Sequence, residues 1–146
     1  HTNATAGNTI IGKNGYELDV IDNSYDLRWS GSGSKLHFCV QEITNTSFKE
    51  LTYIPNVSVQ HDWLHICATY DGKYGMFYFN GEPVAGGFLY NRHSDWPWLI
   101  GKGRYGNLTD YRAFRGLMSV IRLYSRALTD SEIKQNFNSI KSRYGY

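Results

Sequence analysis

The sequence lacks the features that mark a membrane-spanning chain, a nucleic-acid-binding chain or an unprocessed secretory chain. No apolar run approaches the roughly 18 residues that a membrane helix requires. The 15 Lys and Arg nearly balance the 13 Asp and Glu and are scattered along the chain, so there is no basic field to attract nucleic acid. No charged and then apolar leader precedes His1. We therefore expect a soluble chain from which any leader has been removed.

Cysteine is also scarce. Cys39 and Cys67 are the only two, and neither belongs to a Cys-x-x-Cys or a Cys/His metal pattern. In an oxidising compartment they would form one disulfide, and the residues leave the bonded and the free states about equally open. Four glycosylation sequons, a modest excess over chance, favour an extracytoplasmic location, secreted or on a cell or virion surface. The sequon asparagines are Asn3, Asn45, Asn56 and Asn107.

Aromatic residues and glycine are abundant instead. Tyr, Phe and Trp make up 16% of the chain, with 12 Tyr, and there are 15 Gly. Aromatic side chains favour β-strands, whereas many glycines with little Ala or Leu disfavour a helical bundle. A length of 146 residues with 41% hydrophobic residues suffices for one core. We predict a single all-β domain over residues 1–146.

Period-two alternation predicts short strands separated by polar or Gly-rich turns. The stretch 63–70 shows the pattern well, because Leu64, Ile66 and Ala68 fall on one face and the residues between them on the other. The predicted strands are 9–13, 16–20, 26–30, 35–41, 48–54, 63–70, 76–79, 82–84, 99–103 and 116–124.

Two local signals are sharper than alternation. Asn80-Gly81 between two β runs is the strongest short hairpin signal. Thr129 and Glu132 form a capping box ahead of apolar residues at helical spacing, which predicts one short C-terminal helix. Between strands 99–103 and 116–124 we expect a loop over residues 104–115, long enough to carry function.

Two stretches together resemble a family signature. Residues 63–84, WLHICATYDGKYGMFYFNGEPV, are similar to the Trp-His strand, Tyr-Asp-Gly turn and Asn-Gly hairpin of laminin-G-like jelly rolls, and their His-Ile-Cys core resembles pentraxins. Residues 114–137, FRGLMSVIRLYSRALTDSEIKQNF, resemble the closing strand, Arg-Ala-Leu turn and helix of the same family. The resemblance implies a concanavalin-like antiparallel jelly-roll β-sandwich of two sheets. The alternation agrees, because half-buried strands cover their apolar faces by stacking two sheets.

One departure from that family concerns the first strands. Family members usually begin with further strands, including an apolar one with a Trp, ahead of the segment that matches 9–13, where only eight residues stand here. Unpaired strand edges and exposed apolar surface are costly in water. We therefore expect a jelly roll that lacks its first strands, or one that an upstream segment or a neighbouring subunit completes by β-strand addition.

Catalysis is a minor alternative. Glu17, Asp19 and Asp22 nearly match the Glu-x-Asp-x-x-Glu signature of laminarinase-like glycoside hydrolases, and alternation would place Glu17 and Asp19 on one strand face, as a retaining pair needs. Asp22 is shorter than the acid/base Glu of that family, and the chain is short for its cleft. Outward carboxylates on a surface strand are the simpler interpretation, so we do not expect an enzyme.

The pentraxin resemblance implies calcium ligands at Asp22 and Asn23. Where pentraxins have a second acidic cluster, this chain has residues 102–104, Lys-Gly-Arg, which argues against their two-calcium phosphocholine site. A single calcium ion stays open beside a plain Asx turn, because calcium needs six to eight oxygen ligands. Its ligands would come from Asp19, Asp22, Asn23 and Asp26 with backbone carbonyls.

Aromatic residues gather in two predicted loops. Sugar rings stack their C–H faces on Trp and Tyr, and neighbouring polar groups bind hydroxyls; for any one Trp, capping the core at a sandwich end is an equal alternative. We predict a binding or adhesion module for a glycan or cell-surface glycoprotein, with a strand-exchanging structural subunit as the first rival. The predicted contacts are Tyr90, His93, Trp96, Trp98, Tyr105 and Tyr111.

Overall fold

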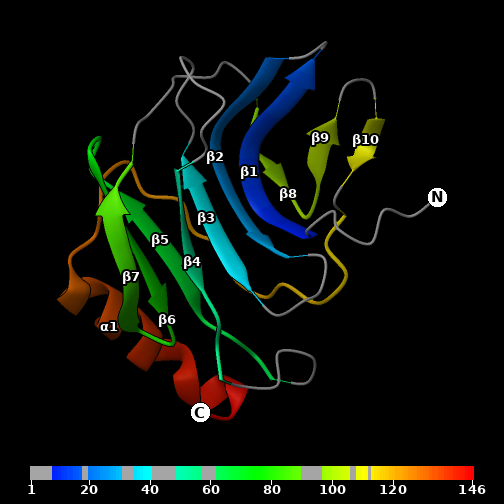
Figure 1. The fold of residues 1–146 in the computed structure, drawn as a ribbon. Helices are drawn as coiled ribbons and strands as arrows, with labels where there is room; N and C mark the ends of the chain where they lie inside the picture. The colour runs from blue at the N-terminus through cyan, green and yellow to red at the C-terminus, as the bar shows by residue number, and fades with distance from the viewer. Residues whose placement is uncertain are drawn as a thin grey trace.

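The strands form two antiparallel sheets and a small hairpin, and one helix follows them (Figure 1). The computed structural model describes residues 8–17, 20–30, 35–40, 49–56, 62–89, 97–105, 108–111 and 113–146; for 14–17, 20–24, 49, 104–105 and 108–111 it describes the backbone alone. The larger sheet has five strands, in the order β4 (Lys49–Tyr53), β3 (Leu36–Val40), β2 (Val20–Trp29), β1 (Asn8–Glu17) and β8 (Leu99–Ile100). This architecture confirms the predicted all-β class.

The smaller sheet contains β5 (Ile66–Tyr70), β6 (Tyr74–Phe79) and β7 (Glu82–Phe88) in that order. The predicted hairpin at Asn80-Gly81 is confirmed. Both residues have positive φ, 51° and 81°, which is the conformation of the primed turns that match strand twist. A side chain at Gly81 would also collide with Phe137, because its Cβ would lie 2.8 Å from that ring.

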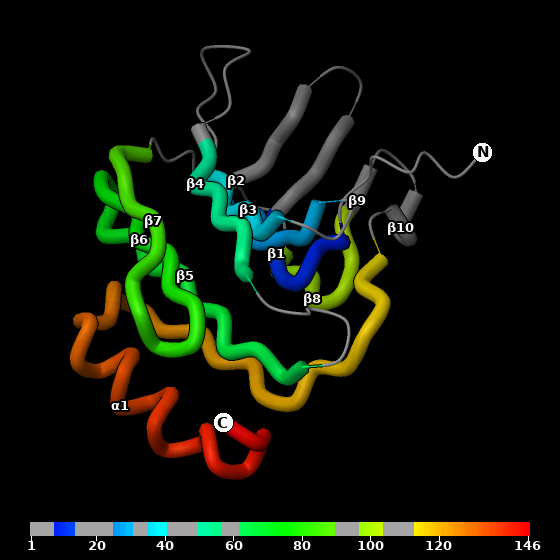
Figure 2. The backbone as a smooth tube through the Cα atoms, turned by 60° about the horizontal axis from the view of Figure 1, so that its bottom comes forward, coloured from blue at the N-terminus to red at the C-terminus, as the bar shows by residue number. Residues whose placement is uncertain are grey.

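The core lies between the two sheets. Leu36 and Phe38 from β3 pack with Phe77 and Phe79 from β6, and all four are buried. Alternation along each strand places these side chains on the inner faces, which is the packing of a β-sandwich. The tube view in Figure 2 shows the two layers separated along this core.

The helix α1 (Asp130–Ile140) covers part of the outer face of the smaller sheet and continues into the short 3₁₀ helix η1 (Lys141–Tyr144). Its predicted capping box is confirmed: the Thr129 hydroxyl accepts from the Glu132 backbone N–H, and the Glu132 carboxylate accepts from the Thr129 N–H. Ile133 is buried with Tyr78, whose hydroxyl donates to the Asp130 carboxylate at 2.7 Å. No helix in the described stretches is long and apolar enough to cross a membrane.

Two sequence predictions of local structure are wrong. Strands 9–13 and 16–20 are not separate, because β1 continues through Asn14-Gly15 with an irregular register and ends at Glu17. The predicted loop 104–115 contains a hairpin, β9 (Gly103–Tyr105) paired with β10 (Leu108–Tyr111). In both cases Gly and Asn suggested a break that pairing with a neighbouring strand overrides.

A third prediction, the strand 116–124, is also wrong, because this segment forms no strand in the structure. No backbone hydrogen bond to another part of the described chain involves these residues, and a segment becomes a strand only when a neighbour pairs with it. Its apolar side chains remain exposed, and Leu117 shows 79% of its surface.

Candidate functional site

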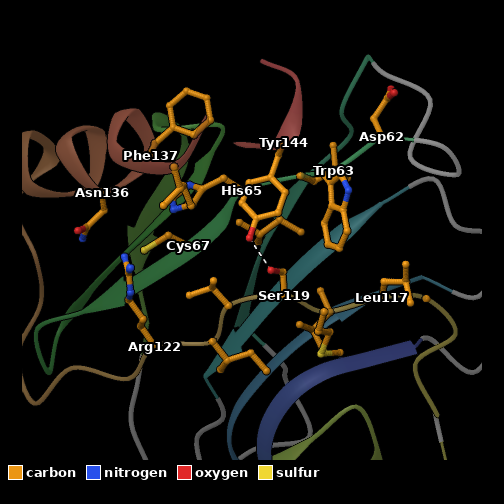
Figure 3. Close-up of a pocket in the computed structure, with 18 of the residues that line it drawn as sticks. Asp62, Trp63, His65, Cys67, Leu117, Ser119, Arg122, Asn136, Phe137 and Tyr144 are labelled. Atoms are coloured by element: carbon orange, nitrogen blue, oxygen red, sulfur yellow. Dashed lines mark hydrogen bonds between the residues drawn. The ribbon is translucent and has the colours of Figure 1, made fainter. Parts of the chain in front are cut away.

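A groove of about 670 Å³ lies between two stretches of chain that are far apart in the sequence. Residues 62–67 form one wall and residues 114–122 the other, and the C-terminal end of α1 with η1 closes one side. Figure 3 shows Trp63, His65 and Cys67 facing Leu117, Ser119 and Arg122 across it. This volume lies within the range of about 300–1,000 Å³ of ligand-binding pockets.

The groove opens onto the core. Ile10 and Trp29 of the larger sheet line it, together with Ile66 of β5 and Leu64 just before that strand. Trp29 belongs to the buried core, and the other three pack against that core. The two sheets therefore do not fully close over their shared apolar interior at this place.

Few polar groups bridge the groove. The Ser119 and Tyr144 hydroxyls are hydrogen-bonded to each other across it (Figure 3). The Tyr146 hydroxyl donates to the Trp63 carbonyl, and the Trp63 and Tyr144 ring centroids are 5.1 Å apart. These contacts come from the last residues of the chain, so the C-terminus holds the two walls at one end only.

His65 is a titratable group on the wall formed by residues 62–67. Its Nδ1 atom is buried and has no hydrogen-bond partner in the described part of the chain. Burial, together with the positive charge of Arg122 on the opposite wall, lowers the pKa of His65 below its usual value. The imidazole is therefore neutral at neutral pH.

A buried ionic network lies on the larger sheet. Arg28 donates to Asp26 at 2.7 Å, to Glu50 at 3.1 Å and to the Cys39 sulfur at 3.1 Å. The side chain of Asp26 is fully buried, and that of Arg28 is 18% exposed. The Arg28 cation thus neutralises Asp26, one of the four predicted calcium ligands. No group of three or more His, Cys, Asp or Glu within the described ranges could hold a metal ion.

Both cysteines are free in this structure, which is one of the two states that the sequence left open. Cys39 lies in β3, where its sulfur takes part in the Arg28 network and donates to Glu50 at 3.3 Å. Cys67 lies in β5 and packs beside Tyr78 and Leu128. The two sulfurs belong to different sheets and to different side-chain clusters. Burial raises the pKa of the Cys67 thiol to about 11 and raises that of Cys39 further.

Trp98 is the predicted contact residue whose side chain the structure describes. Its indole stacks on Tyr25, with centroids 5.6 Å apart and planes 18° apart, and Tyr25 in turn meets Tyr70 edge-on. Tyr70 is held by its hydrogen bond to the Leu89 carbonyl. Trp98 still shows 41% of its surface to solvent. It therefore combines the two alternatives, capping one end of the core while exposing part of its ring.

A second exposed aromatic group was not predicted from the sequence. Tyr74 and Phe88 lie opposite each other on β6 and β7, with ring centroids 5.3 Å apart at 88°, and Lys73 lies over the Phe88 ring. Phe88 is 58% exposed. Both residues flank the hairpin, but Tyr74 lies six residues before Asn80 and Phe88 seven after Gly81, so their pairing depends on the register shift between Phe77 and Tyr78, which the sequence did not indicate.

Several predicted residues cannot be compared. For Tyr105, Tyr111, Asp22 and Asn23 the structure describes only a backbone position in a strand, and Asn56 is an exposed residue in a bend. Glu17 ends β1 and pairs with Val20 at the start of β2, while its predicted partner Asp19 lies outside the described residues. The predicted residues outside the described ranges are Tyr90, His93, Trp96, Asp19, Asn3, Asn45 and Asn107.

Comparison with known proteins adds a family and one solved structure. Residues 2–134 match the family model described as "Concanavalin A-like lectin/glucanases superfamily". No curated protein matches the chain. The chain is also similar to the crystal structure of an S-layer domain-containing protein (residues 221–444) from Clostridium thermocellum, with 19% identity and a TM-score of 0.48. The match covers 94% of this chain and 65% of that one.

Proposed function

Because the chain belongs to the concanavalin A-like lectin/glucanases superfamily, we propose that it is an extracytoplasmic binding module that recognises a carbohydrate, free or on a glycoprotein. The observation that carries the proposal is Trp98, an indole held in place on one side and open to solvent on the other. Carbohydrate ligands use such a platform because their C–H faces stack on aromatic rings.

The fixed position of Trp98 favours binding. A flexible surface tryptophan would lose rotamer freedom when a sugar stacks on it, whereas the stack on Tyr25 has already removed that freedom. Tyr25 is itself positioned by Tyr70, so the platform rests on two strands of different sheets. A sugar that docks here meets a preorganised surface.

The remaining predicted contacts complete the proposed site. Sequence neighbours of Trp98 supply further aromatic rings and the hydrogen-bonding groups that hydroxyls require. They are Tyr90, His93, Trp96, Tyr105 and Tyr111.

The proposal is binding without hydrolysis. A retaining glycosidase needs two carboxylates about 5 Å apart, and the Glu17 and Asp19 pair was expected to meet that need from one continuous strand. The described strand β1 carries no carboxylate besides Glu17, which supports a proposal without hydrolysis. A calcium ion near Asp22 and Asn23 stays an optional part of the proposal. Measuring carbohydrate binding with and without a chelator tests whether the ion is needed.

The test is binding to an array of glycans and to soluble polysaccharides by the wild-type chain, Trp98→Ala and Phe88→Ala. Phe88→Ala is the matched control, because it removes an exposed aromatic ring from another surface. We expect Trp98→Ala to weaken binding about tenfold or more and Phe88→Ala to leave it unchanged.

Two results would contradict the proposal. One is the failure of the wild-type chain to bind any carbohydrate, with and without added calcium. The other is full retention of binding in Trp98→Ala. If Phe88→Ala then loses binding, the site lies at the Tyr74 and Phe88 pair instead. Binding that disappears with a chelator and returns with calcium would establish that a calcium ion is required. Release of reducing sugar from a polysaccharide would show that the chain is a glycoside hydrolase.

A further inference from the structure

The groove between residues 62–67 and 114–122 has the features of a missing β-strand rather than of a small-molecule pocket. Its two walls are extended chain, its base is the apolar core, and its length follows the walls. We infer that this groove accepts an extended segment of another polypeptide, with alternating apolar side chains and at least one carboxylate, which pairs as a β-strand with both walls. This inference is independent of the carbohydrate site, which uses Trp98.

The first wall offers backbone groups at a free edge. β5 pairs only with β6 among the described strands, so its other edge is open. His65 directs both backbone groups towards β6, because its carbonyl accepts from the Asn80 N–H at 2.8 Å and its N–H donates to the Asn80 side chain at 3.0 Å. Backbone direction alternates along a strand. Leu64 and Ile66 therefore direct their N–H and C=O groups into the groove.

The second wall is the segment 116–124, which is rich in apolar residues yet lacks a pairing partner in the described chain. Leu117, Val120, Ile121 and Leu123 are all exposed, each by 42% or more. Exposed apolar side chains are unfavourable in water, and the backbone groups of this segment have no strand partner among the described residues. An added strand would cover the side chains and pair the backbone.

The direction of the walls suits a single added strand. In Figure 3 the wall from Trp63 to Cys67 and the wall from Leu117 to Arg122 run the same way. A segment that enters in the opposite direction is antiparallel to both walls at once, which is the more stable pairing. Figure 2 shows both stretches leading towards the same end of the fold, β5 in green and the 114–124 segment in orange.

Charge selects the partner. The charged residues that line the groove include Arg115 and Arg122 but only one carboxylate, Asp62. Within the described chain, Arg122 has no ion pair. A second copy that offered its own 115–124 segment would bring further arginines and no acid, because that stretch contains no Asp or Glu. A foreign strand that carries a carboxylate complements the groove, whereas self-pairing does not.

The first experiment uses two displayed peptide libraries against the 146-residue chain. In one, apolar residues alternate with positions drawn equally from Asp, Glu, Lys, Ser and Thr; in the other, the same composition follows a helical period. We expect enrichment from the alternating library alone, with acidic residues favoured over Lys. Arg122→Glu should reverse that charge preference, weakening acidic peptides by about fivefold. Equal enrichment from the two libraries, or no enrichment, would overturn the inference.

The second experiment tests the edge itself with a selected peptide. Ile66→Pro removes the N–H that points into the groove, at the first position of β5, where proline is compatible with a strand. Ile66→Ala is the matched control, because it removes a similar volume and keeps the N–H. Since both variants lose core packing, each is first shown to be folded by its circular dichroism. Ile66→Pro should bind about tenfold more weakly than Ile66→Ala, and equal affinities would contradict strand pairing.

Amide hydrogen exchange on the wild-type chain gives a readout that needs no variant. On peptide binding, the amides of Leu64 and Ile66 and alternate amides of 116–124 should slow by about tenfold or more, while that of His65 changes little. Protection of the reverse set would refute the pairing. A dimer of the free chain that protects these same amides would show that a second copy, and not a foreign strand, is the occupant.

Discussion

Replacing Arg28 by alanine should destabilise this fold more than most single substitutions. The Arg28 guanidinium lies 2.7 Å from the Asp26 carboxylate, which is fully buried, and 3.1 Å from Glu50. Burying a carboxylate is costly unless a partner compensates its charge. Removal of one partner of a buried ion pair costs about 3–5 kcal/mol, which is a large part of the roughly 5–15 kcal/mol that stabilise a typical domain.

Arg126→Ala is the matched control for this prediction. Arg126 lies even closer to its carboxylate, 2.6 Å from Glu132, but both side chains are substantially exposed. Solvent screens such a pair, so its loss should cost about 1 kcal/mol or less. The two variants thus separate the effect of burial from the effect of distance.

The measurement is urea unfolding followed by tryptophan fluorescence at neutral pH. The difference in unfolding free energy between Arg28→Ala and Arg126→Ala should be at least about 2 kcal/mol. Asp26→Asn in the Arg28→Ala background should recover part of the loss, because it removes the buried charge that Arg28 had compensated. Equal destabilisation by the two arginine variants would refute the reasoning.

Three further predictions concern separate parts of the fold. Burial and Arg122 lower the pKa of His65 in the folded chain below the usual 6.5, so the unfolded chain binds a proton at this residue at a higher pH than the folded chain does. The free energy of unfolding should therefore fall as the pH drops below about 6.5, and it should fall less steeply in Arg122→Gln. Urea unfolding across a range of pH measures both. Thr129→Ala should cost about 1 kcal/mol in thermal unfolding, and no loss would contradict a contribution from the cap. Thiol titration should find both cysteines unreactive in the folded chain, since burial raises the pKa of Cys67 to about 11. After unfolding without reductant, the titration should find two free thiols. If it finds none, the two cysteines are joined in a disulfide.

The proposed carbohydrate site at Trp98 and the groove proposed to accept a strand lie in different parts of the sandwich. Trp98 stacks on Tyr25 at the end of the core near Tyr70, whereas the groove is closed by η1 and the C-terminus. A chain with both sites could bind a carbohydrate while a partner strand is in place. The two sets of experiments can therefore fail independently.

What the sequence determined by itself was local or periodic. Alternation identified most strands, Asn80-Gly81 identified the hairpin, and Thr129 with Glu132 identified the start of the helix. These signals are readable because a turn conformation, a cap and the two faces of a strand each depend on residues close together in the chain. The family resemblance combined them into the correct fold class.

Only the tertiary structure decided the pairings between distant segments. It left 116–124 without a strand partner among the described residues, placed Cys39 and Cys67 in different sheets, and joined Arg28 to Glu50 across three strands. It also stacked Trp98 on Tyr25. Such contacts depend on which strands become neighbours in a sheet. Alternation of apolar and polar residues predicts the two faces of a strand, but it does not predict which strand pairs with it.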